Sequence, residues 1–419
     1  MAKIQNTKGL IDINGLNETA IKMREELMLL PAAYVGDEFI RMGVDLIGGV
    51  QNKLSSYNYI RYGGLMRPYF PGMDASTDPV GRIEENTLQV YLAAGIHKDN
   101  IQNYTQFALG RMNLLGTNKT YVNPMNALIL YSVMKTWSED LRDAFMFATR
   151  KAGGDNKYDV FDGVYTLLQK AKVDGKLVEG KNYIPTGPIH APVDHNDTEA
   201  LDKAIEFLTE ANPVLVRSGS LLLITSQMSA WIQECIANRF SNAVTPDNYG
   251  TFNIPGWSTV RLVPCMNMGK GDLMILTRQN NLQLGFDSLS DDEYVRVRNI
   301  DDDANIVTYN IQARYGANIR SFDPKMIAIN DGSLTPIAYA GDANGSDRYT
   351  VSVSAGANGT VAVSPQKEKY ALGDTVTATA SPSSDTYEFD KWSDGSMANP
   401  YKFMVMGDKT LSATFKSKA

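Results

Sequence analysis

The sequence predicts an α+β protein that ends in a small all-β domain. Residues 124–151 carry apolar side chains every three or four positions, which is the period of an amphipathic helix. Residues 295–313 alternate apolar and polar side chains, which is the period of a strand. From Tyr349 onward the composition shifts to Thr, Ser, Val and Ala in short runs separated by glycines. Helices and strands therefore share the first part, and strands dominate the last 70 or so residues.

Length and composition exclude several protein classes. With 419 residues, 43% hydrophobic and 21% charged, the chain has the composition of a soluble protein of two or three domains. Its net charge of −7 argues against a dedicated nucleic-acid binder. Two cysteines, Cys235 and Cys265, do not make a disulfide framework and indicate a reducing compartment. No apolar run follows the first lysines or reaches the ~20 residues of a membrane span, so we expect synthesis in a cytoplasm and no membrane partner.

The N-terminal third predicts an arm and a long projecting loop. Residues 1–50 form the arm, with one helix at Asn17–Leu30 that Pro31 ends. Residues 51–95 are rich in Gly and Pro between β-prone aromatic residues, which predicts an extended hairpin with a broad tip. Such a long loop commonly has a partner that covers it. We expect its aromatic residues to contact another subunit, since the loop cannot bury them itself: Tyr57, Tyr59, Tyr62, Tyr69 and Phe70.

The middle of the chain predicts a long helix followed by mixed structure. Asn123 caps the helix at residues 124–151, and Pro124 occupies its first turn, where proline is tolerated. Residues 158–294 mix short apolar strands with amphipathic helices. The alternation from residue 295 predicts a long hairpin with a polar turn at Asp301–Asn305. That turn explains the acidic run more simply than a calcium site does.

The residues that could carry chemistry do not form a site. His190 and His195 lie five apart in a Pro-containing loop; we expect surface residues, with metal ligation as the alternative. His97 is isolated, and Cys235 lies on an apolar helix face. The sequence contains no phosphate-binding glycine loop, dinucleotide fingerprint or nucleophile elbow. We therefore predict no catalytic, cofactor-binding or metal residue and no enzyme activity.

The order of elements over residues 1–335 resembles the major capsid proteins of tailed bacteriophages, which have the Hong Kong 97 fold. The stretches that carry the resemblance are "GRIEENTLQVYLAAGIHKDNI", the helix at residues 124–151, "VFDGVYTLLQKA" and "VTYNIQARYGANIRSFDPKMIAI". The resemblance implies a peripheral domain from residues 96–157 and 295–335 and an axial domain from residues 158–294. It also implies that the loop lies over a neighbouring subunit.

That resemblance implies a structural role and a set of partners. The chain would assemble with itself into hexamers and pentamers of an icosahedral shell, in the host bacterial cytoplasm, and would reside in the virion capsid. A separate scaffolding protein is expected, because only about 50 residues precede the loop. The other implied partners are a portal, further capsid proteins and packaged double-stranded DNA held by weak, sequence-independent contacts. Residues 54–97 contain no lysine, so we expect no covalent cross-link between loops.

The C-terminal module, residues 349–419 after a linker at 336–348, resembles the divergent internalin-type B-repeat. The residues that carry this resemblance are Gly359, Tyr370, Gly373, Asp374, Phe389, Trp392 and Phe415. The resemblance implies a module on the shell surface that binds host-surface or mucus glycans or clamps the capsomers. Trp392 fits a core residue or a glycan-stacking platform, and Tyr387 and Tyr401 are further candidate glycan contacts. Two other proteins stay open as alternatives: an encapsulin-like compartment shell and a bacterial surface adhesin.

Overall fold

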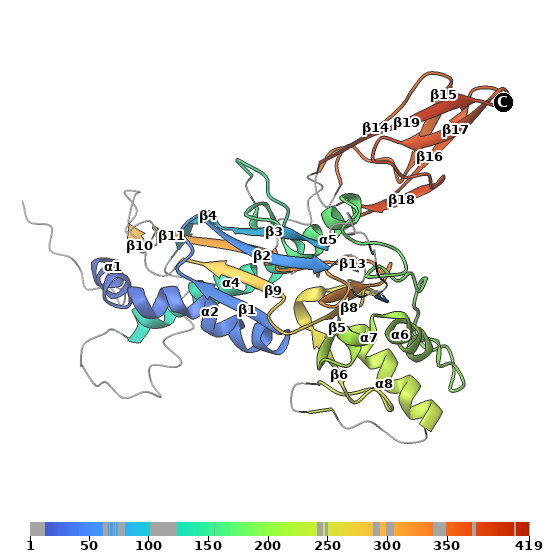
Figure 1. The fold of residues 1–419 in the computed structure, drawn as a ribbon. Helices are drawn as coiled ribbons and strands as arrows, with labels where there is room; N and C mark the ends of the chain where they lie inside the picture. The colour runs from blue at the N-terminus through green and yellow to red at the C-terminus, as the bar shows by residue number, and fades with distance from the viewer. Residues whose placement is uncertain are drawn as a thin grey trace, which may run out of the picture. The chain divides into compact units, whose positions relative to one another are not determined.

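The computed structural model describes most of the chain as two compact units. The described residues are 13–61, 66, 68–69, 71, 73, 80–100, 124–154, 156–240, 246–247, 250–287, 294–298, 306–337, 349–370, 374–405 and 408–418. The first unit comprises residues 1–145 and 282–320, and the second comprises residues 146–281 and 321–419. Each unit contains both helices and strands (Figure 1), so the predicted α+β class is confirmed.

The first unit is a sheet packed with helices. Its helices are α1 (Ile13–Lys22), α2 (Arg24–Arg41) and most of α4 (Pro124–Phe147). Its sheet runs β1-β9-β11-β10, with β4 also paired to β11. These strands are β1 (Val44–Gly48), β4 (Tyr91–Asn100), β9 (Leu282–Phe286), β10 (Tyr294–Arg298) and β11 (Ile306–Ile319). The antiparallel pair β10–β11 gives the two strands of the predicted long hairpin, and its predicted turn at Asp301–Asn305 lies outside the described residues.

The arm helices α1 and α2, helix α4 and the β10–β11 pair share an apolar core. Ala20 and Leu27 from the arm pack with Met134 of α4 and with Val297 and Tyr309 of the β10–β11 pair. All of these side chains are buried. The long helix is therefore held by side chains far away in the sequence, as expected for a marginally stable amphipathic helix.

The arm differs from its prediction at Pro31. The helix does not end there, because Pro31 lies inside α2, and the break between helices falls earlier, at Met23. Proline in a helix interior costs about 3 kcal/mol through a lost hydrogen bond and a clash. Burial offsets this cost, since Phe39 at the far end of α2 is fully buried against Phe145, with ring centroids 4.7 Å apart.

The projecting loop is a two-stranded hairpin at its base. Strands β2 (Lys53–Arg61) and β3 (Gly81–Gln89) pair antiparallel in unbroken register, from Lys53 opposite Gln89 to Arg61 opposite Gly81. Both strands lie within the segment 51–95, which its Gly and Pro residues predict to be an extended loop.

The second unit begins where α4 ends. The helix was expected to reach Lys151 but ends at Phe147. The following backbone turns to a neighbouring segment instead: the Thr149 amide donates to the Tyr158 carbonyl at 2.7 Å, and the Lys151 amide donates to the Asp159 carbonyl at 3.0 Å. These bonds replace the helical ones that the sequence pattern had suggested.

A mixed sheet flanked by helices forms the body of the second unit. Its strand order is β12-β8-β5-β6, and β5 and β6 run parallel. The main strands are β5 (Ser220–Thr225), β6 (Val260–Cys265), β8 (Ile275–Thr277) and β12 (Ile327–Ile329), with a short pair β7 (Lys270–Gly271) and β13 (Leu334–Thr335). The helices are α5 (Val164–Val173), α6 (Glu199–Glu210), α7 (Pro213–Val216) and α8 (Ser226–Phe240).

The C-terminal module is a small sandwich of two three-stranded sheets, β14-β19-β17 and β15-β16-β18. The strands are β14 (Val351–Ala355), β15 (Gly359–Ser364), β16 (Thr375–Pro382), β17 (Tyr387–Trp392), β18 (Tyr401–Met404) and β19 (Lys409–Ser417). Its core gathers the inward residues of both sheets around Trp392. The predicted all-β domain at the C-terminus is confirmed.

Candidate functional site

The outer face of the β2–β3 hairpin carries three exposed apolar side chains among polar ones. Tyr57 and Tyr59 are two positions apart and therefore lie on the same face of β2, and Ile83 lies directly opposite Tyr59 on β3. Their exposed fractions are 67%, 57% and 71%. Gly81 keeps this arrangement possible, because a Cβ there would lie 2.6 Å from the Tyr59 ring. We call Tyr57, Tyr59 and Ile83 the outer apolar stripe.

The opposite face of the hairpin anchors it to the first unit. The amides of Asn58 and Asn86 both donate to the carbonyl oxygen of Arg320, the second at 2.9 Å. Leu88 is fully buried in a small cluster with Val50 and Val90. A two-stranded ribbon is marginal by itself, so these contacts fix which face points outward. The described residues leave the outer apolar stripe uncovered.

The predicted contact residues of the loop have different outcomes. Tyr57, Tyr59 and Tyr69 are exposed, with Tyr69 at 85%, whereas Tyr62 and Phe70 lie outside the described residues. Ile83 was not among the predicted contact residues, which were all aromatic. Strand register supplies the missing signal, since Ile83 faces Tyr59 across the ribbon. Exposed apolar side chains on a ribbon with open edges can accept a second polypeptide.

Trp392, one of three candidate glycan contacts, belongs to the core of the module. Its side chain is fully buried, and its Nε1 donates to the Ala398 carbonyl at 2.8 Å. The rings of Phe389 and Tyr401 lie 5.4 and 6.1 Å from it. The indole therefore has no exposed face on which a sugar ring could stack.

Tyr401 and Tyr387 are half-buried. The Tyr401 hydroxyl donates to Asp394 Oδ2 at 3.0 Å, and Lys409 Nζ reaches the same oxygen at 3.2 Å. Burial, together with the charge of Asp394, holds the pKa of Tyr401 well above its ordinary value. Tyr401 is thus committed to an internal network, while Tyr387, at the start of β17, has a partly exposed ring.

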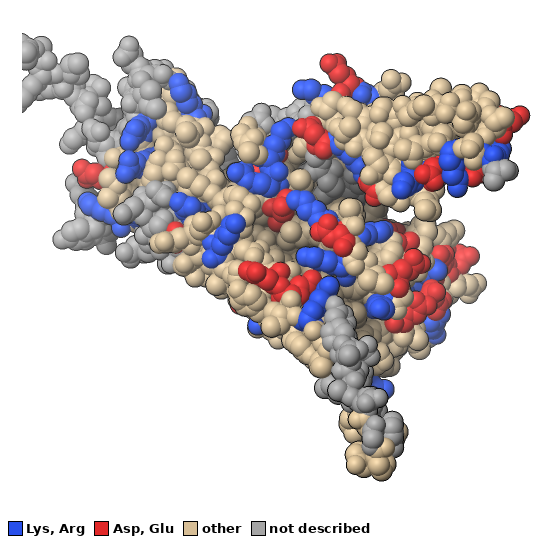
Figure 2. All heavy atoms as spheres, turned by 45° about the horizontal axis from the view of Figure 1, so that its top comes forward, with Lys and Arg blue, Asp and Glu red and all other residues tan. Residues whose placement is uncertain are grey.

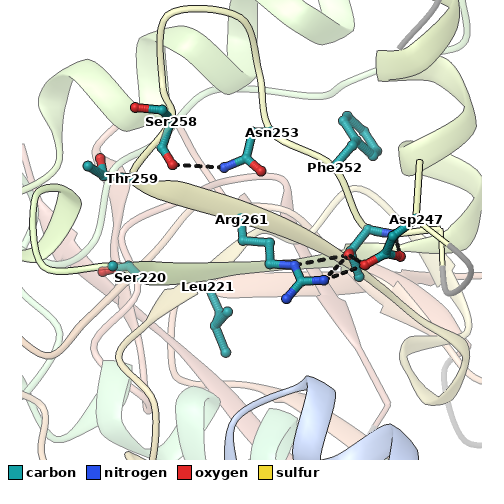
Figure 3. Close-up of a pocket in the computed structure, with 10 residues that line it drawn as sticks. Ser220, Leu221, Asp247, Phe252, Asn253, Ser258, Thr259 and Arg261 are labelled. Atoms are coloured by element: carbon teal, nitrogen blue, oxygen red, sulfur yellow. Dashed lines mark hydrogen bonds and ion pairs between the residues drawn. The ribbon is translucent and has the colours of Figure 1, made fainter. Parts of the chain in front are cut away.

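A polar cavity of about 610 Å³ lies beside β5 and β6 (Figure 3). Arg261 points across it, donates to Thr251 Oγ1 at 2.9 Å from Nε, and pairs with the Asp247 carboxylate. Asn253 donates to the carbonyls of Ser258 and Val260 at 3.0 and 2.7 Å. These polar groups satisfy one another. Hydrogen bonds among these groups, including one from the Thr251 hydroxyl to the Asp247 carboxylate, therefore hold the surrounding loop in place.

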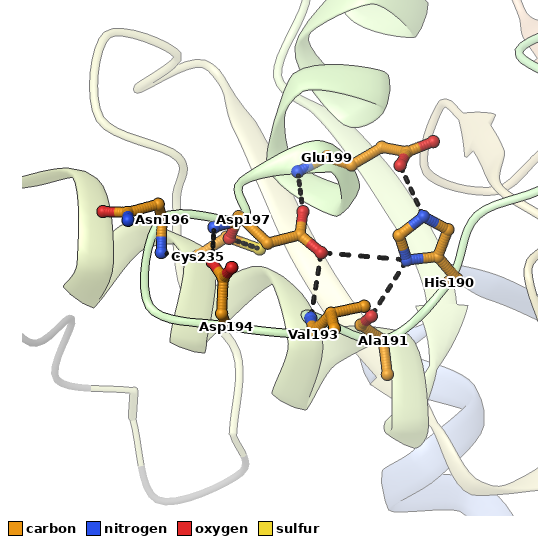
Figure 4. A network of polar contacts seen from close by, with 8 residues as sticks. All are labelled: His190, Ala191, Val193, Asp194, Asn196, Asp197, Glu199 and Cys235. Carbon is orange, nitrogen blue, oxygen red and sulfur yellow. Dashed lines mark hydrogen bonds and ion pairs between the residues drawn. The ribbon is translucent and has the colours of Figure 1, made fainter.

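A second polar network surrounds His190 at the start of α6 (Figure 4). His190 Nε2 lies 2.5 Å from Glu199 Oε2, and Nδ1 lies 2.9 Å from the Ala191 carbonyl oxygen. Asp197 accepts from the amides of Val193 and Glu199, which lowers the pKa of its carboxyl. The Ala191 carbonyl, and then the Glu199 charge, raise the pKa of His190 above its ordinary value. His195 is exposed and outside this network.

We expect the second unit to lose some stability as His190 deprotonates. Because its pKa is raised in the folded state, its contribution is complete below the unfolded value of about 6.5 and is lost as the pH rises through the folded pKa. An NMR titration checks the raised pKa and its cause, because Glu199→Gln should lower the His190 pKa. Glu206→Gln is the matched control, because Glu206 pairs with Lys203 instead. Equal titrations in both variants would contradict the assignment.

No site for a metal ion emerges from the described residues, since no three His, Cys, Asp or Glu side chains are suitably grouped there. Cys235 and Cys265 are both buried, and burial raises the pKa of the Cys235 thiol. No described helix has the length and apolar character needed to cross a bilayer. On the face drawn in Figure 2, the described basic and acidic side chains are interspersed.

Comparison with known proteins links the module to a family. Residues 349–419 match the family model described as "Divergent InlB B-repeat domain". This match confirms the predicted resemblance of the module. No curated protein matches the chain in sequence.

Among solved structures, the chain is similar to capsids and capsid-like particles. One is the satellite phage P4 procapsid including the size determination (Sid) protein: 12% identity, 75% of this chain, 89% of that chain, TM-score 0.44. The capsid of a native GTA particle is 9% identical, with 70% of this chain and 89% of that chain covered and a TM-score of 0.42. A virus-like particle from Pyrococcus furiosus is 10% identical, with 73% of this chain and 98% of that chain covered and a TM-score of 0.35.

Proposed function

We propose that this chain is the major capsid protein of a tailed double-stranded DNA bacteriophage, with a Hong Kong 97-like subunit over residues 1–335. The order of its elements supports the proposal: a helical arm, a projecting hairpin, a long helix packed on a sheet, and a mixed α/β region. The observation that carries it is the outer apolar stripe. An anchored hairpin that presents Tyr57, Tyr59 and Ile83 outward is built to lie on another chain.

In a ring of identical subunits, each hairpin covers a neighbour and each body receives one. Burial of apolar surface contributes roughly 25 cal/mol per Å², and a closed ring repeats the contact at every interface. We infer that these hairpin contacts join subunits into the hexamers and pentamers of an icosahedral shell. Scaffolding and portal proteins are the further partners, and assembly takes place in the host bacterial cytoplasm.

The charge of the chain suits a container for DNA. A net charge of −7 disfavours tight binding of the packaged polyanion. Contacts to DNA are then few and independent of sequence. The expected absence of covalent cross-links between hairpins stays a prediction, which the mass of boiled particles checks.

We place the C-terminal module on the outer surface of the shell. One copy on every subunit would make a dense array, in which weak affinity for a glycan becomes useful through multivalency. Tyr387 is the aromatic residue best placed for stacking, because Trp392 is buried and Tyr401 is bonded internally. Stabilisation of capsomers by the module is the alternative role.

Velocity sedimentation of the expressed full-length protein tests the shell function. We expect a uniform species in the megadalton range, either alone or with a candidate scaffolding protein. A species that stays at the mass of one subunit under both conditions would contradict the proposal. Particles that hold a co-purified enzyme instead of nucleic acid would favour the encapsulin-like alternative.

A further inference from the structure

The C-terminal module contacts the segment that follows helix α4, residues 148–163. Asp408 lies just before β19, and its two carboxylate oxygens accept from two different parts of the chain. Oδ1 accepts from the Thr350 amide at 2.8 Å, within the module. Oδ2 accepts from Lys151 Nζ at 2.9 Å, outside it. The Thr350 amide, then Lys151, hold the pKa of Asp408 below its ordinary value. Asp408 therefore stays ionised at neutral pH and links the module to residues 148–163.

Tyr349, the first described residue of the module, makes a second contact with the same segment. Its side chain is only 2% exposed, and its hydroxyl donates to Asp159 Oδ1 at 3.4 Å. Its backbone is fixed from the module side, because Tyr349 and Tyr370 exchange amide-to-carbonyl hydrogen bonds of 2.9 and 2.8 Å. Lys151 Nζ also lies 5.9 Å from the centre of the Tyr349 ring.

The receiving side of the contact has hydrogen bonds of its own. Asp159 is 3% exposed, and its Oδ2 accepts from the Asn156 amide at 3.2 Å. The Asn156 side chain in turn accepts from the Tyr158 amide at 3.0 Å, which closes the turn. Gly154 leaves room for the carboxylate, since a Cβ there would lie 2.4 Å from Asp159. Asp159 is thus also held by a hydrogen bond within its own loop.

We propose that the module is docked in cis on residues 148–163, through Asp408–Lys151 and Tyr349–Asp159, and is not a freely tethered domain. Two separate contacts resist rotation about either one, whereas a single ion pair would not. Docking in cis is a property of one chain. Only its consequence, a module held in one orientation on every subunit of a shell, rests on the proposed function.

Zero-length cross-linking of the full-length protein tests the docking. A carbodiimide activates an accessible carboxylate, and an amine in ion-pair contact displaces the activated group to leave an amide. The side chains of Lys151 and Asp408 are 46% and 49% exposed, so the reagent can reach them. Lys367 and Asp374, 2.8 Å apart inside the module, are the internal positive control. We expect both cross-linked peptide pairs by mass spectrometry.

An equal mixture of ¹⁵N-labelled and unlabelled protein separates docking in cis from docking in trans. Docking in cis predicts Lys151–Asp408 peptides of a single isotope. Pairs of mixed isotope would show that the module reaches a neighbouring chain and would overturn the proposal. Detection of the Lys367–Asp374 control cross-link without the Lys151–Asp408 cross-link would also overturn the proposal. Asp408→Asn should remove this cross-link, and Asp374→Asn should leave it. Unassembled protein suffices, so a failure of shell assembly is a separate result.

Discussion

Ile83→Asp should abolish shell assembly while the subunit stays folded. The substitution places a charge in the outer apolar stripe, opposite Tyr59 and two residues from Glu85. Ile83 is 71% exposed in the single chain, so the subunit loses little by the change. In the proposed interface the same position is buried, and an unpaired carboxylate there costs several kcal/mol per contact. Each 1.4 kcal/mol raises the concentration needed for association about tenfold.

Thr87→Asp is the matched control for this prediction. Thr87 lies on the same face of β3, four residues further along, and is also exposed. It is opposite Ser55, outside the outer apolar stripe. Sedimentation should give shells for Thr87→Asp and free subunits for Ile83→Asp, with the same far-ultraviolet circular dichroism for both. Normal shells from Ile83→Asp would remove the hairpin from the interface.

Trp392→Ala should unfold the C-terminal module and leave the rest of the chain intact. The side chain is fully buried between Phe389 and Tyr401, and its Nε1 hydrogen bond is lost as well. Truncation of a buried Trp costs about 3–5 kcal/mol, which is comparable to the whole stability of a small domain. Limited proteolysis should remove the module from the variant and spare it in the natural protein.

Thr360→Ala is the control for the module, because Thr360 is an exposed residue of β15. Its module should resist protease as the natural one does. Particles of Trp392→Ala should still form, since the apolar core of the module is separate from the core that holds the arm, α4 and β10–β11. Loss of particles in this variant would make the module part of the shell's framework.

Sequence periodicity was sufficient for the elements whose side chains face one core. The alternation of β10–β11 and the short strands of the module follow directly from where their apolar residues fall. Pro31 was misinterpreted because its local cost was weighed without the burial of Phe39, which depends on Phe145 more than 100 positions away. The end of α4 was misplaced for a similar reason: hydrogen bonds to Tyr158 and Asp159 compete with the helix.

The candidate sites show the same limit. The exposed aromatic residues of the hairpin could be predicted, because a long punctuated loop has no core of its own. Ile83 could not, because only strand register places it opposite Tyr59. The same holds for the Arg261–Asp247 pair, for His190 with Glu199, and for Lys151 with Asp408, 257 positions apart. Each of these pairs forms because the fold brings the two side chains together, and the spacing of the residues in the sequence does not show this.

Electron microscopy of the purified full-length protein, beside a chain truncated after Asn344, tests the central claim most directly. If residues 1–335 are a shell subunit, both proteins should form closed particles of uniform diameter, with surface projections on the full-length particles only. The scaffolding protein should be supplied to both samples. Single subunits from both proteins, with the scaffold present, would contradict the account.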